Sequence, residues 1–186
     1  DILTRFFKNG VMERKNVVPS FSPSMDIQVS SNFERLLFEI CDRDTSKVKK
    51  KMDLFKHSGS FEISTKEMLK VNDLFSAYMV SDNETLDIIK TVFKNHDYTL
   101  DPHSAVGYGA AKQAYNDKII SKDVPLVSLA CAHPAKFPDI INKAINIRPN
   151  LPANLKFMMS SEEHFRVIDP KVADIQNLIK SNTRLK

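Results

Sequence analysis

The sequence predicts an α/β fold with an open, mostly parallel sheet and flanking helices. An apolar run at residues 124–130 is too short for a helix and is typical of a strand buried on both faces of a parallel sheet. Residues 139–145 follow after a small loop, and their apolar positions have helical spacing. A helical pattern that begins at residue 101 precedes the run. The order helix, strand, helix is typical of a doubly wound sheet.

Composition and charge exclude several classes of protein. The chain has 186 residues, 42% of them hydrophobic and 27% charged, which is ordinary for a soluble globular domain. The net charge of +4 is modest, and the densest basic stretch, residues 47–56, matches no nucleic-acid-binding motif. We therefore expect the solvated face of a helix there and no nucleic-acid partner. No apolar run approaches the length of a membrane span, so no membrane partner is expected either.

The two cysteines, Cys41 and Cys131, lie far apart and have no metal-ligand spacing. This pattern indicates a reducing compartment without a disulfide framework and without a metal site. We expect a cytoplasmic protein, with an organelle as the alternative.

Short helices are expected in the first 41 residues. Residues 1–10 predict one helix, whose end is marked by Gly10. The spacing of Ser31 and Glu34 predicts a capping box ahead of a second helix. Between the two helices lie polar residues that are hard to explain as core, because an ordinary loop does not need so many small polar groups beside apolar ones. They are Ser22, Ser24, Asp26 and Asn32.

Residues 42–96 are predicted to form a mainly helical excursion. Phe61 and Ile63 alternate with polar neighbours, as in a very short strand. Ser64 and Glu67 have the spacing of a second capping box, and Asp82 is expected to cap the next helix. We expect a packing unit here rather than a site of chemistry.

Asp101 followed by Pro102 has the form of a helix N-cap with proline at the first helical position. The helix that follows contains Gly107 and Gly109, each of which costs about 1 kcal/mol relative to alanine. We therefore expect this helix to approach the predicted strand closely. Asp169 and Pro170 repeat the cap-and-proline pattern ahead of a last helix, for which we expect a buried stripe at Val172, Ile175, Leu178 and Ile179.

Candidate functional residues stand at the end of the predicted strand, because ligands of open α/β sheets bind at the carboxyl ends of strands. Cys131 is such a residue, although a free cysteine there is also typical of a small buried core residue. His133 follows in the loop and has no acid–base partner that the sequence identifies. Asp101, His103 and Ser104 contain the letters of a catalytic triad, but no nucleophile elbow supports that interpretation.

Three segments of the chain carry a family resemblance. They are residues 22–37, which begin Ser-Pro-Ser-Met-Asp, residues 101–107, which read Asp-Pro-His-Ser-Ala-Val-Gly, and residues 132–137, which read Ala-His-Pro-Ala-Lys-Phe. In this order they resemble the threonine synthases of bacterial and fungal type and the threonine synthase-like proteins of animals. The resemblance covers most of the chain, and residues 42–72 match only weakly.

The resemblance implies the C-terminal portion of a pyridoxal-phosphate enzyme of fold type II. Cys131 stands where the family typically has threonine, whose hydroxyl faces the pyridine nitrogen of the cofactor. A thiol is a weaker donor than a hydroxyl, so the contact would be poorer but of the same kind. The resemblance also implies that Asp101, His103, Ser104 and His133 line the cleft that receives the substrate.

The resemblance further implies a domain assignment. Residues 1–41 and 97–186 would belong to the large cofactor-binding α/β domain, with residues 42–96 as the helical excursion. The chain begins with Asp1 rather than methionine or a signal peptide, so we expect it to be cut from a longer protein. In the family, the upstream half holds the first domain and the lysine that carries the cofactor. We therefore expect no catalytic residue in this chain, an inactive fragment, and the upstream half as its partner; Lys136 is not in that lysine's context.

The implied reaction of the whole enzyme converts O-phospho-L-homoserine, a small phosphorylated amino acid, and water to L-threonine and phosphate. A first alternative is a phospho-lyase of the same family that gives 2-oxobutyrate, ammonia and phosphate, and the cysteine at position 131 fits such a divergent member slightly better. A second alternative is a catalytically silent interaction fragment.

Overall fold

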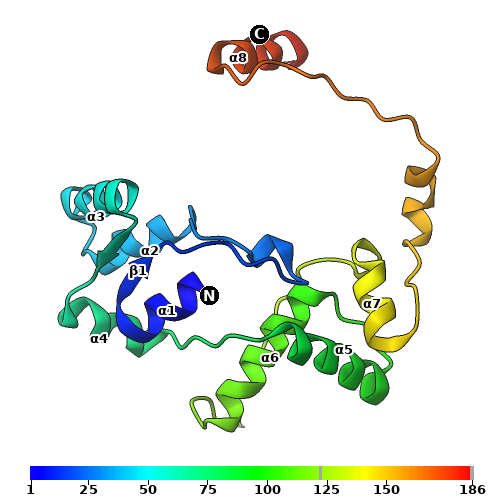
Figure 1. Cartoon of the computed structure of the whole chain (residues 1–186), viewed down its shortest axis with the longest axis horizontal. Coiled ribbons are helices and arrows are strands. Elements are labelled where there is room, and N and C mark those ends of the chain that lie inside the picture. The colour runs from blue at the N-terminus through cyan, green and yellow to red at the C-terminus, as the bar shows by residue number, and fades with distance from the viewer. Residues whose placement is uncertain (122, 185–186) are drawn as a thin grey trace. The chain divides into compact units, whose positions relative to one another are not determined.

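The computed structural model describes residues 1–121 and 123–184, which are mainly helical. The chain divides into two compact units, Asp1–Asn150 and Leu151–Lys186. In the first unit the elements follow in the order α1 (Ile2–Asn9), β1 (Val11–Glu13), the 3-10 turn η1 (Pro23–Met25), α2 (Phe33–Ile40), α3 (Thr45–Ser58), β2 (Ser60–Glu62), α4 (Thr65–Leu74), α5 (Asp82–His96), α6 (Pro102–Asn116), the 3-10 turn η2 (Pro134–Lys136) and α7 (Pro138–Ile145) (Figure 1). No helix in the described part of the chain is long and apolar enough to cross a membrane.

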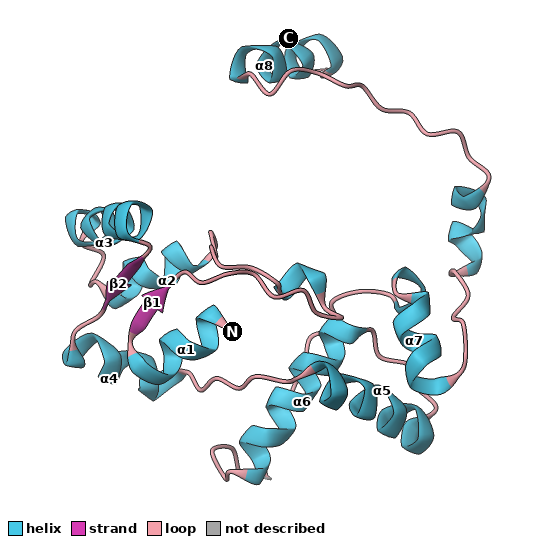
Figure 2. Cartoon of the chain, in the orientation of Figure 1, coloured by secondary structure: helices cyan, strands magenta, loops and turns pink. Residues whose placement is uncertain are grey.

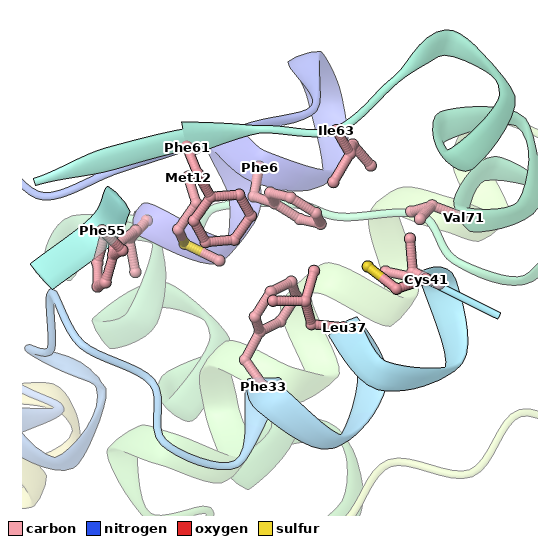
Figure 3. Close-up of a cluster of buried hydrophobic side chains, with 11 residues drawn as sticks. Phe6, Met12, Phe33, Leu37, Cys41, Phe55, Phe61, Ile63 and Val71 are labelled. Atoms are coloured by element: carbon pink, nitrogen blue, oxygen red, sulfur yellow. The ribbon is translucent and has the colours of Figure 1, made fainter. Parts of the chain in front are cut away.

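The first hydrophobic core lies among α1, α2, α3, α4 and the two short strands. Phe6 is completely buried, and its ring meets those of Phe33 and Phe61 edge-on at centroid distances of 4.7 and 6.3 Å (Figure 3). Edge-on aromatic pairs are favourable beyond the area they bury. Gly10 ends α1 in the left-handed conformation, at φ 76°, as the sequence predicts, and turns the chain directly into β1.

β1 and β2 pair antiparallel, with Met12 opposite Phe61 (Figure 2). The predicted strand at Phe61 is therefore confirmed, but its partner lies in residues 11–13, outside the predicted excursion of residues 42–96. The excursion does contain α3, α4 and α5, and its assignment as a separate part of the chain stays a prediction.

A second, smaller core joins α5, α6 and α7. Its buried members are Ile89, Ala105 and Ile141, one from each helix, and α5 packs against both α6 and α7 (Figure 1). Gly109 allows this packing, because a Cβ atom at that position would lie 2.5 Å from Ile88 Cδ1. A Cβ atom at Gly107 would lie 3.3 Å from Ser128 Oγ. Only Gly107 therefore faces the segment predicted as a strand, whereas Gly109 faces α5.

Two of the N-terminal helix caps are as predicted. Ser64 and Glu67 form a complete capping box at α4. Asp101 caps α6 with Pro102 at the first helical position.

Three predicted N-terminal caps are wrong. Asp82 does not cap α5, because its carboxylate accepts the Phe21 backbone N–H at 3.0 Å; Ser81 makes the capping box instead. Hydrogen bonds from the Ser81 hydroxyl and amide lower the pKa of the Glu84 carboxyl in that box.

At α2 the predicted box of Ser31 and Glu34 is replaced by Asn32 as N-cap, without a side-chain bond. Backbone bonds to the carbonyls of Ser30 and Ser31 close the turn before the helix. At the last helix Lys171 is the N-cap, and the Asp169 carboxylate pairs with the Lys171 ammonium.

The predicted open parallel sheet is not confirmed, because β1 and β2 form the one sheet within residues 1–121 and 123–184. Residues 124–131 have no regular secondary structure, and Val127 and Leu129 are 79% and 77% exposed. A strand needs hydrogen-bonding neighbours, and a single extended segment cannot satisfy its own backbone groups. With no neighbouring strand among the described residues, the apolar run stays uncovered.

The second unit contains η3 (Ala153–Met159) and the last helix, α8 (Val172–Asn182). The helix is where the sequence predicts it, but the apolar stripe is not buried: Val172, Ile175 and Ile179 are exposed.

Overpacking at Gly109 should destabilise the fold. We expect Gly109→Leu to lower the free energy of unfolding by about 1–3 kcal/mol, because the new side chain must displace Ile88 and Val80. Thermal unfolding would measure this. Lys112→Leu, at an exposed position of the same helix, is the control, and equal melting temperatures for the two variants would contradict the packing at Gly109.

Candidate functional site

The candidate site is built around the carboxylate of Asp101, which is only 1% exposed. Asp101 caps α6: its Oδ1 atom accepts the backbone N–H groups of His103 and Ser104 at 3.0 and 3.4 Å. These are donors that the first turn of a helix cannot satisfy internally. The cap predicted from the sequence is therefore present, but it is buried rather than at the surface.

The same carboxylate also accepts hydrogen bonds from beyond the helix backbone. Its Oδ2 atom accepts the backbone N–H of Ala132 at 3.2 Å and a hydrogen bond from the Ser104 hydroxyl. His103 Nδ1 lies 3.2 Å from Oδ1. A buried carboxylate is costly unless hydrogen bonds replace its water shell, and these five contacts do so. We call Asp101, His103 and Ser104 the Asp101 cluster.

The hydrogen bonds of His103 fix which ring nitrogen carries a proton. Its Nε2 atom accepts the backbone N–H of Ser24 at 3.2 Å, so Nε2 carries no hydrogen. The proton then sits on Nδ1 and is donated to Asp101. The ring also packs on Phe137, with centroids 4.9 Å apart. His103 thus ties the turn at residues 22–26 to the start of α6.

Ser104 connects the start of α6 to a second distant segment, at Cys131. Its single hydroxyl proton goes to Asp101, which leaves the oxygen free to accept the backbone N–H of Cys131 at 2.8 Å. Because Ser104 donates to Asp101 and not to His103, the three residues do not form a nucleophile–base pair. Their arrangement holds backbone groups in place and does not activate a hydroxyl.

Cys131 itself is exposed, with Sγ 3.6 Å from the carbonyl oxygen of Leu129. The interpretation of Cys131 as a small buried core residue is therefore wrong for the described residues. Cys41 is the buried cysteine, and burial together with the nearby Glu67 carboxylate raises the pKa of its thiol. Of the two thiols, Cys131 is the one available to a ligand.

His133 is near in sequence but is used differently. It caps the short turn η2, where its Nδ1 atom accepts the backbone N–H of Ala135 at 3.1 Å, and its side chain is exposed. The structure thus brings together Asp101, His103, Ser104 and the backbone of Cys131, while the His133 ring is bonded within its own turn. The roles of all five residues toward a ligand stay predictions.

Ser24 is a member of the site to which no sequence motif gives a role. The signal was the excess of small polar residues in its segment, which the structure explains in part. Asp26 accepts the backbone N–H and the hydroxyl of Ser20, at 2.8 and 2.7 Å, and so closes the turn that presents Ser24.

A separate groove lies away from the Asp101 cluster. It has a volume of about 250 Å³ and runs between α5 and α6, with Glu84, Asp87 and Lys112 among its lining residues and no member of the Asp101 cluster. The described residues also contain no group of histidine, cysteine and acidic side chains that could hold a metal ion.

Comparison with known proteins gives consistent matches. Residues 104–179 match the family model described as threonine synthase, C-terminal. The threonine synthase of Pseudomonas aeruginosa is 38% identical over 183 residues, which cover 98% of this chain and 38% of that enzyme. The threonine synthase of Saccharomyces cerevisiae is 34% identical, with 97% and 38% covered. Human threonine synthase-like 1 is 32% identical over 79% of this chain and 19% of its own length.

Solved structures agree with these matches. The crystal structure of pyridoxal-phosphate-bound threonine synthase from Brucella melitensis superposes with a TM-score of 0.85 at 41% identity, covering 99% of this chain and 39% of that one. Yeast threonine synthase gives 0.79 at 32% identity, with 97% and 39% covered. The chain thus spans about 38% of the length of the first curated relatives that it matches.

The stability of the site should depend on the charge of Asp101. In Asp101→Asn one carboxylate oxygen becomes an NH₂ group that faces N–H or O–H donors, so at least one buried donor loses its partner. We expect a loss of about 2–3 kcal/mol in unfolding free energy, measured by denaturant titration. Asp87→Asn, on the exposed face of α5, is the matched control. A midpoint for Asp101→Asn equal to that of the control would show that the charge is not needed.

Proposed function

Because the chain belongs to the family of threonine synthases and threonine synthase-like proteins, we propose that it is the C-terminal portion of a pyridoxal-phosphate-dependent carbon–oxygen lyase. The whole enzyme would convert O-phospho-L-homoserine and water to L-threonine and phosphate. One observation carries the proposal. The three segments that resemble the family, at residues 22–37, 101–107 and 132–137, converge on the Asp101 cluster although they are far apart in sequence.

Pyridoxal phosphate, when bound, supplies an electron sink that permits proton loss beside the substrate amino group and departure of the phosphate. The residues of this chain suit one end of that cofactor. The Cys131 thiol is exposed, and its backbone is fixed by Ser104. A thiol is a neutral, weak donor, which suits a pyridine nitrogen that is to stay unprotonated. We assign Cys131 to that contact.

The rest of the cofactor site we place in the part of the enzyme that this chain does not span. That part would supply the lysine that carries the cofactor and the loop that binds its phosphate, and the isolated chain would be inactive. It would also supply strands beside residues 124–130, whose apolar side chains are uncovered. We propose the cytoplasm as the location, because two free cysteines suit a reducing compartment.

A phospho-lyase of the same family is the second candidate. Cysteine stands at the position where the family typically has threonine, and the match to human threonine synthase-like 1 covers 79% of this chain. Such an enzyme would release phosphate from the same substrate and give 2-oxobutyrate and ammonia.

Product analysis distinguishes these functions. We expect the whole enzyme, loaded with pyridoxal phosphate and incubated with O-phospho-L-homoserine, to release phosphate and form L-threonine in equal amounts. Chromatography of the amino acids and a keto-acid assay would measure both products. Formation of 2-oxobutyrate in place of threonine would establish the phospho-lyase, and release of no phosphate would favour a silent interaction fragment.

Substitution of Cys131 tests its assignment. We expect Cys131→Thr to keep or strengthen cofactor binding, since a hydroxyl is the better donor, and Cys131→Asp to shift the absorbance of the bound cofactor. Spectra and cofactor titrations of the whole enzyme would measure this. Cys41→Ser, in the first core, is a control that leaves this contact alone. If neither Cys131 variant changed the spectrum, the side chain would not face the cofactor ring.

A further inference from the structure

Three backbone N–H groups from two distant segments are held by side chains of one helical turn. Ser24 is bonded to His103, Cys131 to Ser104, and Ala132 to Asp101. The acceptors are all buried, and all belong to residues 101–104 at the start of α6. The first turn of α6 therefore fixes the distance between residues 24 and 131.

The charge of Asp101 sets the direction of every bond in this arrangement. It draws the hydroxyl proton of Ser104, so the Ser104 oxygen can only accept from Cys131. It likewise draws the proton of His103 to Nδ1, so Nε2 can only accept from Ser24. One negative charge thus leaves a single arrangement of protons, and such fully satisfied buried networks are rigid.

The residues that are held present their side chains outward. The backbone N–H of Cys131 is fixed while its thiol is exposed, and the same holds for Ser24 and its hydroxyl. A site of this kind works when its contact residues are locked by hydrogen bonds from a supporting layer. Errors of about 1 Å in such a layer are enough to reduce activity strongly.

We propose that His103 and Ser104 are positioning residues of this enzyme, which fix the Cys131 thiol and the turn around Ser24 in one geometry through the buried Asp101. The inference rests on the proposed function, because it treats Cys131 as the residue that faces the cofactor. The proposal also places the turn at residues 22–26 in the same site, because Ser24 is bonded to His103, which lies 79 positions further along the chain.

The experiment compares Ser104→Ala with Ser104→Thr in the whole enzyme. Ser104→Ala removes the acceptor of the Cys131 N–H, whereas Ser104→Thr keeps a hydroxyl. We expect Ser104→Ala to weaken cofactor binding about tenfold, the effect of one lost buried hydrogen bond, to shift the cofactor absorbance, and to speed amide hydrogen exchange in the peptide containing residues 131 and 132. Ser104→Thr should restore all three quantities.

A matched pair at His103 tests the other tie. In His103→Gln the side-chain oxygen can still accept from Ser24, so exchange in the peptide covering residues 22–26 should stay slow. In His103→Asn the amide reaches Asp101 but not Ser24, so exchange in that peptide should rise while the peptide at residues 131 and 132 changes less. Should Ser104→Ala fail to fold, Ser104→Cys, with its weaker acceptor, takes its place.

The outcomes separate positioning from a purely structural role. A Ser104→Ala protein with a lowered melting temperature but an unchanged cofactor dissociation constant and spectrum would overturn the proposal. Amide exchange is measured without cofactor. Unaltered exchange in both peptides would therefore overturn the positioning role even if the enzyme were active. If the wild-type enzyme bound no pyridoxal phosphate, the proposed function would fail, while faster exchange in Ser104→Ala would still support the ties.

Discussion

A negative charge that is almost completely removed from water governs the arrangement of the first unit. An unpaired buried carboxylate would cost several kcal/mol, so Asp101 must collect donors, and the helix that it caps supplies only some of them. The remaining donors come from the Ser104 hydroxyl, from His103 and from the backbone of Ala132. Satisfying one charge thus forces the start of α6 and residues 131–132 to meet.

The turn at residues 22–26 joins this arrangement from a different core. It lies between β1 and α2, both of which contribute to the first core, whereas Ser24 and the preceding Phe21 contact the helices α5, α6 and α7. Phe21 donates its N–H to Asp82 of α5 and lies beneath the Lys143 ammonium of α7, 4.7 Å from the ring centroid. Ser24 is bonded to His103 of α6. Phe21 and Ser24 therefore link the chain between β1 and α2 to the helices that form the second core.

The segment leading to Cys131 is uncovered among the described residues. Its apolar side chains are exposed and its backbone lacks neighbouring strands, although its end is fixed by Ser104 and Asp101. The segment is thus anchored at residues 131 and 132, while its backbone and apolar side chains are free to pair with neighbouring strands. Under the proposed function, strands from the part of the enzyme that this chain does not span would pair with this run.

The sequence by itself determined the features that depend on three or four neighbouring residues. Gly10 ends α1, Ser64 and Glu67 form the capping box of α4, and Asp101 caps α6. These signals are local, because a cap bonds to amides two or three positions away. The family segments also pointed to Asp101, His103 and Ser104, and to Cys131, which directly precedes the third segment.

Tertiary structure decided what depends on remote partners. Ser81 rather than Asp82 caps α5, because the Asp82 carboxylate accepts the backbone N–H of Phe21. Asp101 likewise accepts a hydrogen bond from Ala132, which the sequence around the cap does not predict. Ser24 enters the site because folding brings its N–H to His103. The apolar run before Cys131 has the pattern of a strand, but a strand forms only with neighbours, and no local pattern can supply them.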